Sequence, residues 1–213
     1  MLDFGCGRGG LVAAACEAGF DAVGVDVAAW NLWTAGVVAP GRIALIPPDD
    51  RLPFRDATFD VITSNVVFEH LAHPAPALAE LARVLRPGGL LLTLFPAREM
   101  WFEPHLKAPW LHRLPRGSRA ERISLALGNR VTRTRGEDPA EQLWRLHETT
   151  FYRTEAEWRA LFAQHFAPEG RHEAAWLRDL LARRGVPLPL PDALLAWLCP
   201  RVAGLCWSWR RLA

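Results

Sequence analysis

The sequence lacks long apolar runs and any marked excess of charge of one sign. No stretch of about 18 apolar residues is present, so we expect no transmembrane helix, and the first residues do not have the basic and apolar parts of a signal peptide. The 25 Lys and Arg nearly balance the 23 Asp and Glu. A net charge of +2 gives no electrostatic reason to expect a nucleic-acid partner.

Cysteine and tyrosine are also scarce. One tyrosine stands against ten tryptophans, and the four cysteines lie far apart, at Cys6, Cys16, Cys199 and Cys206. Their spacing fits neither a disulfide framework nor a metal site, which favours a reducing compartment. We therefore expect a cytoplasmic protein.

The first half of the chain has the pattern of an α/β fold. Up to about residue 96, short apolar runs alternate with amphipathic stretches, as in βαβ units around a parallel sheet. Strands are predicted at residues 1–4, 22–25, 43–46, 61–63 and 90–95. A helix is predicted at residues 11–18, and another where Leu78, Leu81, Ala82 and Leu85 recur with helical spacing. We expect a doubly wound, Rossmann-like, mostly parallel sheet with helices on both faces.

The second half has a different composition. Residues 97–146 are rich in Pro, Arg and Trp and give no clear strand signal, so we predict an insertion or lid. Trp158, Leu161, Phe162 and Phe166 then predict an amphipathic helix. Since 213 residues suit one α/β domain, we expect a single domain, with residues 1–96 as its core and residues 147–213 as its C-terminal part.

The C-terminal segment, residues 194–213, allows two interpretations. Its Trp and Arg content could mark a helix in a membrane interface, and hence a peripheral membrane contact. However, Leu205, Trp207 and Trp209 alternate with smaller or polar residues, which is the period of a half-buried strand. We favour the strand, antiparallel to the rest of the sheet.

A glycine-rich turn joins the first predicted strand to the first helix, with the sequence DFGCGRGG at residues 3–10. Glycines let the backbone approach a ligand, and the N–H groups of such a turn suit an anionic group. Gly5, Gly7 and Gly10 also match G-x-G-x-x-G, so this motif alone fits a dinucleotide site or a plain tight turn. Asp26 ends the second strand and could bind the two ribose hydroxyls or cap the following helix.

Further segments help to decide whether this turn belongs to a dinucleotide site or to the site of another cofactor. They are LPF at residues 52–54, FD at residues 59–60, EH at residues 69–70 and RVLRPGG at residues 83–89. Together with DFGCG they resemble, in order and spacing, the methyltransferase domain of class I S-adenosylmethionine-dependent methyltransferases of the type 11-like small-molecule family. The resemblance covers roughly the first 95 residues and makes a nicotinamide-dependent oxidoreductase the less favoured alternative.

The resemblance implies transfer of a methyl group from S-adenosyl-L-methionine to a small-molecule acceptor, for example a lipid-linked, glycan or secondary-metabolite intermediate. A non-catalytic, methyltransferase-like binding protein is the other alternative. Family members usually carry a few dozen residues before the first strand, which cover the cofactor. This chain starts inside that strand, so we expect either a truncated start or a cofactor covered by the segment after Pro96.

The resemblance also implies a cofactor site. Asp3 and the backbone of Gly5 and Gly7 would hold the amino-acid end of the cofactor. The ribose would bind Asp26, and the adenine would pack on Val27.

Two further cofactor contacts are less regular in this chain. Where the family has an Asp for the adenine amino group, this chain has Pro48, and we expect Asp49 to replace it unless it is simply a solvated loop residue. Asn65, just after the fourth strand, would face the methionine part, or else form a turn.

The acceptor side depends on histidines and tryptophans. His70 is a candidate general base, because its ordinary pKa is near neutrality, and a packed, hydrogen-bonded histidine is the alternative. Trp101 and His105, in the predicted lid, are candidates for binding the acceptor. Glu103-x-His105 has the spacing of metal ligands, but the sequence identifies no third ligand, so we expect no metal.

Overall fold

A seven-stranded sheet organises the computed structural model, which describes residues 1–27, 39, 41–47, 51–134, 136–186 and 189–213. The order is β3-β2-β1-β4-β5-β9-β8. The strands are β1 (Leu2–Phe4), β2 (Val23–Val27), β3 (Ile43–Ile46), β4 (Phe59–Asn65), β5 (Leu85–Phe95), β8 (Phe166–Arg171) and β9 (Leu205–Arg211). Strands β1 to β5 pair in parallel, whereas β9 is antiparallel to both β5 and β8.

This topology confirms the predicted fold class, a mostly parallel Rossmann-like sheet with an antiparallel C-terminal strand. It also differs from the all-parallel order 3-2-1-4-5-6 that is common in dinucleotide-binding domains. An antiparallel strand, β9, lies where that order has a parallel one.

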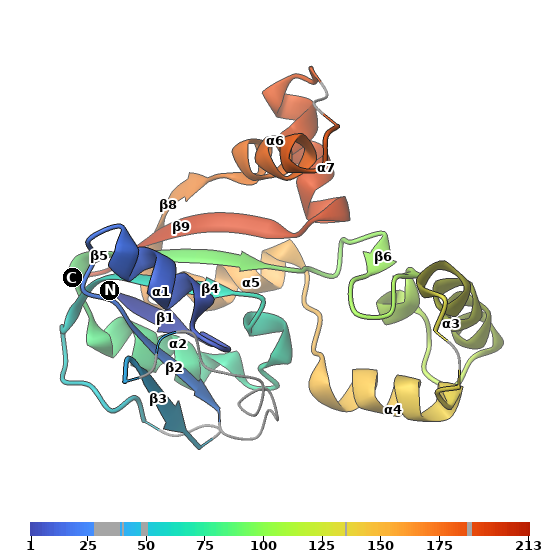
Figure 1. The fold of residues 1–213 in the computed structure, drawn as a ribbon, viewed down its shortest axis with the longest axis horizontal. Coiled ribbons are helices and arrows are strands. Elements are labelled where there is room, and N and C mark those ends of the chain that lie inside the picture. The colour runs from blue at the N-terminus through green and yellow to red at the C-terminus, as the bar shows by residue number, and fades with distance from the viewer. Residues whose placement is uncertain (28–38, 40, 48–50, 135, 187–188) are drawn as a thin grey trace.

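Helices cover both faces of the sheet. They are α1 (Gly10–Glu17), α2 (Pro74–Val84), α5 (Glu155–Phe162), α6 (Glu173–Arg183) and α7 (Asp192–Val202). In Figure 1, α1 lies in front of the sheet, and α2 and α5 lie behind it. A capping box between Thr154 and Glu157 begins α5, and Pro74 begins α2 at a position where a missing N–H costs little.

The large core behind the sheet explains much of the tryptophan content. Phe162 stacks on Trp209 with ring centroids 4.8 Å apart, and Trp158 and Trp207 are buried beside them. Because Trp207 and Trp209 are each 2% exposed within β9, the interfacial-helix interpretation of residues 205–211 is wrong and the strand is confirmed. These two buried tryptophans therefore cannot contribute to the predicted peripheral membrane contact. No described helix is long and apolar enough to cross a membrane.

Several element boundaries were wrongly predicted, and two of them change the sheet. Phe166 begins strand β8 rather than extending helix α5, and β8 itself was not predicted. This strand pairs on one side, contains Pro168 and is interrupted by a bulge, so it lacks an alternating apolar pattern. Strand β5 begins at Leu85, not at residue 90, because Leu85 pairs with Phe59 beyond an irregularity in the β4–β5 ladder.

Residues 97–152 form a separate layer at the carboxyl end of β5, and Figure 1 shows most of it projecting to one side of the sheet. Its elements are β6 (Phe102–Glu103), β7 (Ala108–Pro109), the 3-10 helix η3 (Leu111–Arg113), α3 (Arg119–Thr132) and α4 (Pro139–Thr149). A small core of Ala108, Leu111, Leu125 and Leu146 holds it together. At Gly128 a Cβ would lie 2.6 Å from the Leu106 carbonyl oxygen, so this glycine lets α3 lie close to β7.

Candidate functional site

The predicted cofactor residues gather at the carboxyl edge of the parallel strands. Asp3 lies in β1, Asp26 in β2, and Asn65 ends β4. Because β1 is flanked by β2 and β4, the strand order reverses direction at β1. Ligands of doubly wound proteins bind in the crevice outside such a switch point.

The two glycines of the turn have different surroundings. Gly5 has φ +75°, and a Cβ there would lie 2.1 Å from a methyl carbon of Val67, so Gly5 is required for packing inside the turn. Gly7 has φ +52°, and a Cβ there would meet no atom of the described residues within 4 Å. No described residue therefore fills the space above Gly7, as the close approach of a ligand to its backbone requires.

The Asp26 carboxylate fixes this turn. The backbone N–H of Gly7 donates to Asp26 Oδ2 at 2.6 Å, and the N–H of Val27 donates to Oδ1 at 2.7 Å. A carboxylate has about four acceptor positions, so two remain for the ribose hydroxyls predicted to bind here. The alternative role, capping a helix in residues 28–35, concerns residues outside the described part of the chain. Asp49 also lies outside it.

Asp3 is a buried carboxyl group with one hydrogen-bond donor from a side chain. Thr63 Oγ1 donates to Asp3 Oδ1 at 2.8 Å. Burial raises the pKa of Asp3 to about 6, the Thr63 bond opposes this rise, and the nearby Asp26 carboxylate adds to it. A cationic group beside Asp3, such as the ammonium of a methionine moiety, would stabilise its ionised form. Thr63 was not singled out in the sequence, because its position opposite Asp3 depends on the β1–β4 register.

The chain makes a strained turn after Asn65. Asn65 is exposed, and the next residue, Val66, has φ +58°, an unusual conformation for a β-branched residue. The N–H of Val66 donates to the carbonyl of Leu94, and the following residue, Val67, packs against Gly5. Strained backbone is frequent at binding sites, which agrees with a ligand-facing role for Asn65 without testing it.

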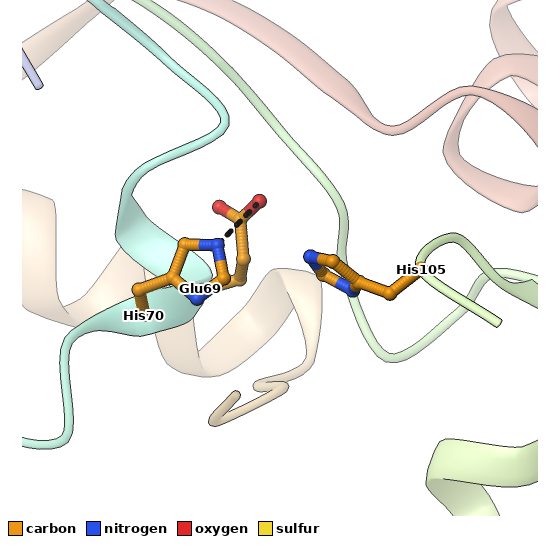
Figure 2. Close-up of side chains that lie close together, drawn as sticks. All are labelled: Glu69, His70 and His105. Carbon is orange, nitrogen blue, oxygen red and sulfur yellow. Dashed lines mark ion pairs between the residues drawn. The ribbon is translucent and has the colours of Figure 1, made fainter. Parts of the chain in front are cut away.

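The 3-10 helix η2 (Phe68–His70) brings a glutamate and a histidine to the same edge of the sheet. Figure 2 shows Glu69 and His70 beside His105, which comes from the loop between β6 and β7. Their ligand atoms all lie within 4.8 Å of one another. Glu69 is 0% exposed, neither of its carboxylate oxygens has a hydrogen-bond partner among the described residues, and burial raises its pKa to about 7.

The ring of His70 is held by the last residue of α4. Its Nδ1 lies 2.6 Å from the carbonyl oxygen of Thr149, so Nδ1 carries the proton that is donated there. Burial lowers the pKa of His70 in spite of this bond, which keeps the ring neutral near pH 7. A packed, hydrogen-bonded histidine is thus present, and a neutral ring is also the form that a general base needs. The role of base stays a prediction.

A network around Glu103 orients His105. Glu103 Oε1 lies 2.7 Å from His105 Nδ1 and 2.6 Å from the hydroxyl of Tyr152, and Oε2 accepts the N–H of Leu106. Burial opposes the charge of both residues, but their mutual hydrogen bond lowers the pKa of Glu103 and raises that of His105. Tyr152 was not predicted here. Its being the single tyrosine of the chain was the one available signal.

A cavity of about 320 Å³ lies beside this network. Its wall contains Tyr152 and several basic side chains, namely Arg98, His112, Arg116, His147 and Arg153. His105 therefore lies close to the cavity through Tyr152, whereas Trp101 does not line it. The Trp101 ring instead packs edge-on against Trp197 of α7, with centroids 6.2 Å apart.

Comparisons with known proteins agree with this geometry. Residues 2–93 match the family model described as a methyltransferase domain. An uncharacterized methyltransferase of Mycobacterium bovis is 34% identical over 99 residues, which are 46% of this chain and 40% of that protein. A ubiquinone biosynthesis O-methyltransferase of Maricaulis maris is 34% identical over 97 residues, which are 43% of this chain and 38% of that protein. The chain thus spans about two fifths of the length of these relatives.

The similarity in fold extends over the whole chain. A crystal structure of an S-adenosylmethionine-dependent methyltransferase from Mesorhizobium loti superimposes with a TM-score of 0.62, covering 99% of this chain and 90% of that one. The sequence identity is 19%, so this likeness concerns the fold.

Proposed function

The chain carries a methyltransferase domain of the class I S-adenosylmethionine-dependent family, and from this premise we propose that it transfers a methyl group from S-adenosylmethionine to a small-molecule acceptor. The observation that carries the proposal is the space above Gly7, which no described residue fills, beside the turn that the Asp26 carboxylate holds at the switch point of the sheet. When bound, the cofactor supplies an electrophilic methyl group on its sulfonium.

The residues present fit this cofactor. Asp3 supplies a buried carboxylate for the cationic amino group, and the backbone beside Gly7 supplies room for the amino-acid end. Asp26 retains acceptor positions for the ribose hydroxyls. We propose that Val27, next to it, contacts the adenine. Asn65 would contact the methionine part from the other side of the switch point. We propose Asp49 for the adenine amino group on sequence grounds alone.

We propose that residues 97–152 act as the lid and that the acceptor binds in the cavity beside Tyr152, whose lining residues all lie between Arg98 and Arg153. The cavity of about 320 Å³ has a wall rich in Arg and His, which suits an acceptor that carries acidic or other hydrogen-bond-accepting groups. Methyl transfer is an in-line displacement, so the main task of the protein is to orient the acceptor. We propose that His70, which is neutral and held by Thr149, removes a proton from an acceptor hydroxyl.

Parallel calorimetric titrations of the purified chain with S-adenosylhomocysteine and with NAD test the proposal. We expect saturable binding of S-adenosylhomocysteine and no saturable binding of NAD. Stronger binding of NAD would replace the proposal with an oxidoreductase. Failure to bind either ligand, with the chain folded by circular dichroism, would indicate a non-catalytic relative.

A further inference from the structure

The three side chains of the Glu69 cluster have the composition of a metal site. A carboxylate and two imidazoles, from Glu69, His70 and His105, lie with their ligand atoms within 4.8 Å of one another. His70 Nε2 is 3.9 Å from Glu69 Oε1, which is too far for a hydrogen bond. Figure 2 shows both rings and the carboxylate directed at a common region.

The second ring nitrogen of each histidine is bound in the way that metal sites require. His70 Nδ1 donates to the Thr149 carbonyl, and His105 Nδ1 donates to the Glu103 carboxylate. These bonds place a proton on Nδ1 of each ring, so Nε2, on the side of Glu69, is the nitrogen that would bind a metal in place of a proton. Metal-binding histidines are commonly oriented by such carbonyl and carboxylate acceptors.

Glu69 makes the cluster unusual. It is 0% exposed, and its two oxygens accept no hydrogen bond within the described part of the chain. A buried carboxylate facing two imidazole lone pairs is costly unless a cation lies between them. We propose that Glu69, His70 and His105 bind a divalent first-row transition metal, with zinc as the ion tested first.

The ligand set decides the class of metal. Two imidazoles and one carboxylate suit zinc and related ions, whereas magnesium and calcium prefer oxygen ligands. Ligands of a tetrahedral zinc lie about 3.3 Å apart, given bonds of about 2.0 to 2.1 Å, so the side chains would move together on binding. His105 is on a loop and its side chain is 37% exposed, which leaves it room to do so.

Three protein ligands leave a fourth position for water or for an oxygen of the acceptor. A metal on Nε2 would replace the role of His70 as general base, because the ring has no second lone pair, and the metal would instead make a bound hydroxyl more acidic. This last role rests on the proposed function, but binding of the metal itself does not. The cluster corrects the argument made from the sequence, in which Glu103 and His105 lacked a third ligand. In the structure, Glu103 orients His105, and the further ligands come from residues 69 and 70.

The test is a zinc titration of the full chain after removal of metals with a chelator, using a chromophoric competitor for zinc. We expect one zinc per chain. His105→Ala should weaken zinc binding by about 100-fold or more, Glu69→Gln by about 10- to 100-fold, and Glu103→Gln, which removes an orienting group, by about tenfold. Magnesium should bind more weakly than zinc. The matched control is His73→Ala, because His73 is a nearby exposed histidine outside the cluster, and it should bind zinc like the unsubstituted chain.

Circular dichroism and the melting temperature show whether each variant is folded. If Glu69→Gln is unfolded, His105→Ala still tests zinc binding, because His105 is on an exposed loop. Absence of stoichiometric zinc binding by the unsubstituted chain would overturn the proposal and favour a proton shared by Glu69 and His70. Equal affinity of His105→Ala and the unsubstituted chain would overturn it as well. S-adenosylhomocysteine binding measured on the same samples reports separately on the proposed function.

Discussion

The two halves of the molecule build their sites in different ways. At the proposed cofactor site, a contiguous turn between β1 and α1 presents its backbone, and Asp26 of the neighbouring strand holds the turn. At the proposed acceptor site, the side chains of Glu69 and His70 meet His105, which lies 35 residues further along the sequence. Recognition by backbone leaves a local motif in a sequence, whereas recognition by assembled side chains leaves none.

The largest effect should separate the two glycines of the turn. Gly7→Val should weaken S-adenosylhomocysteine binding by more than about 100-fold, because its side chain would enter the open space above the turn, with strain of about 1 to 2 kcal/mol from the positive φ. Gly5→Val should instead destabilise the fold, by about 2 to 4 kcal/mol, because it would overlap Val67. Calorimetry and urea unfolding measure the two effects.

The comparison within this pair is the control. If Gly7→Val unfolded the domain as readily as Gly5→Val, Gly7 would be structural, and the open space would not be evidence for a ligand.

The next effect concerns Asp26. Asp26→Ala should weaken S-adenosylhomocysteine binding by about 1.5 to 3 kcal/mol, because the charge-assisted hydrogen bonds to the ribose are lost together with the bond that holds Gly7. Asp21→Ala is the matched control, since Asp21 precedes the same strand and forms an exposed ion pair with Arg42. Isothermal titration of both variants decides the matter, and equal affinities would limit Asp26 to a structural role.

What the sequence could predict of the fold depends on the same difference between local patterns and contacts formed by folding. Strands β1 to β4 and helix α2 were predicted in the right places, because apolar periodicity records which face is buried, although β4 extends two residues beyond each predicted end and Leu85 belongs to β5. The Trp207 and Trp209 alternation predicted β9 for the same reason. Strand β8 was missed, since an edge strand with Pro168 and a bulge buries too little to leave a period.

The site shows the limit more clearly. Gly5 and Gly7 came from a motif and Asp26 from the end of the second predicted strand, and the structure brings Asp26 onto the turn of these glycines. The assembly of Tyr152, Glu103 and His105 could not be predicted, because it depends on how residues 97–152 pack against one another at the carboxyl end of β5. Trp101 was a candidate for the acceptor pocket because of its large apolar ring, but that ring packs against Trp197 of α7.

The ionisation of Asp3 should make two quantities depend on pH: the free energy of unfolding and, by about tenfold for each pH unit, the affinity for S-adenosylhomocysteine. Its pKa of about 6 lies above the ordinary value of 3.8, so the folded chain holds this proton more tightly than the unfolded chain. The stability that this proton gives is complete below about pH 4 and is lost as the pH rises to about 6, at a cost of about 2 to 3 kcal/mol.

Binding of the cofactor amino group should favour ionised Asp3, so S-adenosylhomocysteine affinity should fall about tenfold per pH unit below pH 6. Asp3→Asn should flatten both profiles, in unfolding free energy and in affinity. Calorimetry between pH 5 and 7 measures the second, and an unchanged slope in the variant would assign the titration to another group.

The smallest change in cofactor affinity is expected for substitutions in residues 97–152, the proposed lid. His105→Ala and Trp101→Ala should each change S-adenosylhomocysteine affinity by less than tenfold, or about 1.4 kcal/mol, because neither residue contacts the glycine turn. Their other effects should differ. His105→Ala should lower methyl transfer to hydroxylated small molecules at least tenfold, since it belongs to the cluster with Glu69, whereas Trp101→Ala should mainly lower the melting temperature by removing the packing on Trp197.

Radiolabelled methyl transfer to a panel of acceptors, together with thermal unfolding, separates these outcomes. If Trp101→Ala reduced turnover as much as His105→Ala while leaving stability unchanged, the acceptor would extend toward α7, beyond the cavity beside Tyr152. If both variants lost S-adenosylhomocysteine binding with the fold intact, residues 97–152 would cover the cofactor itself. The acceptor pocket would then have to lie elsewhere, and the two halves would share one site instead of dividing the work between two.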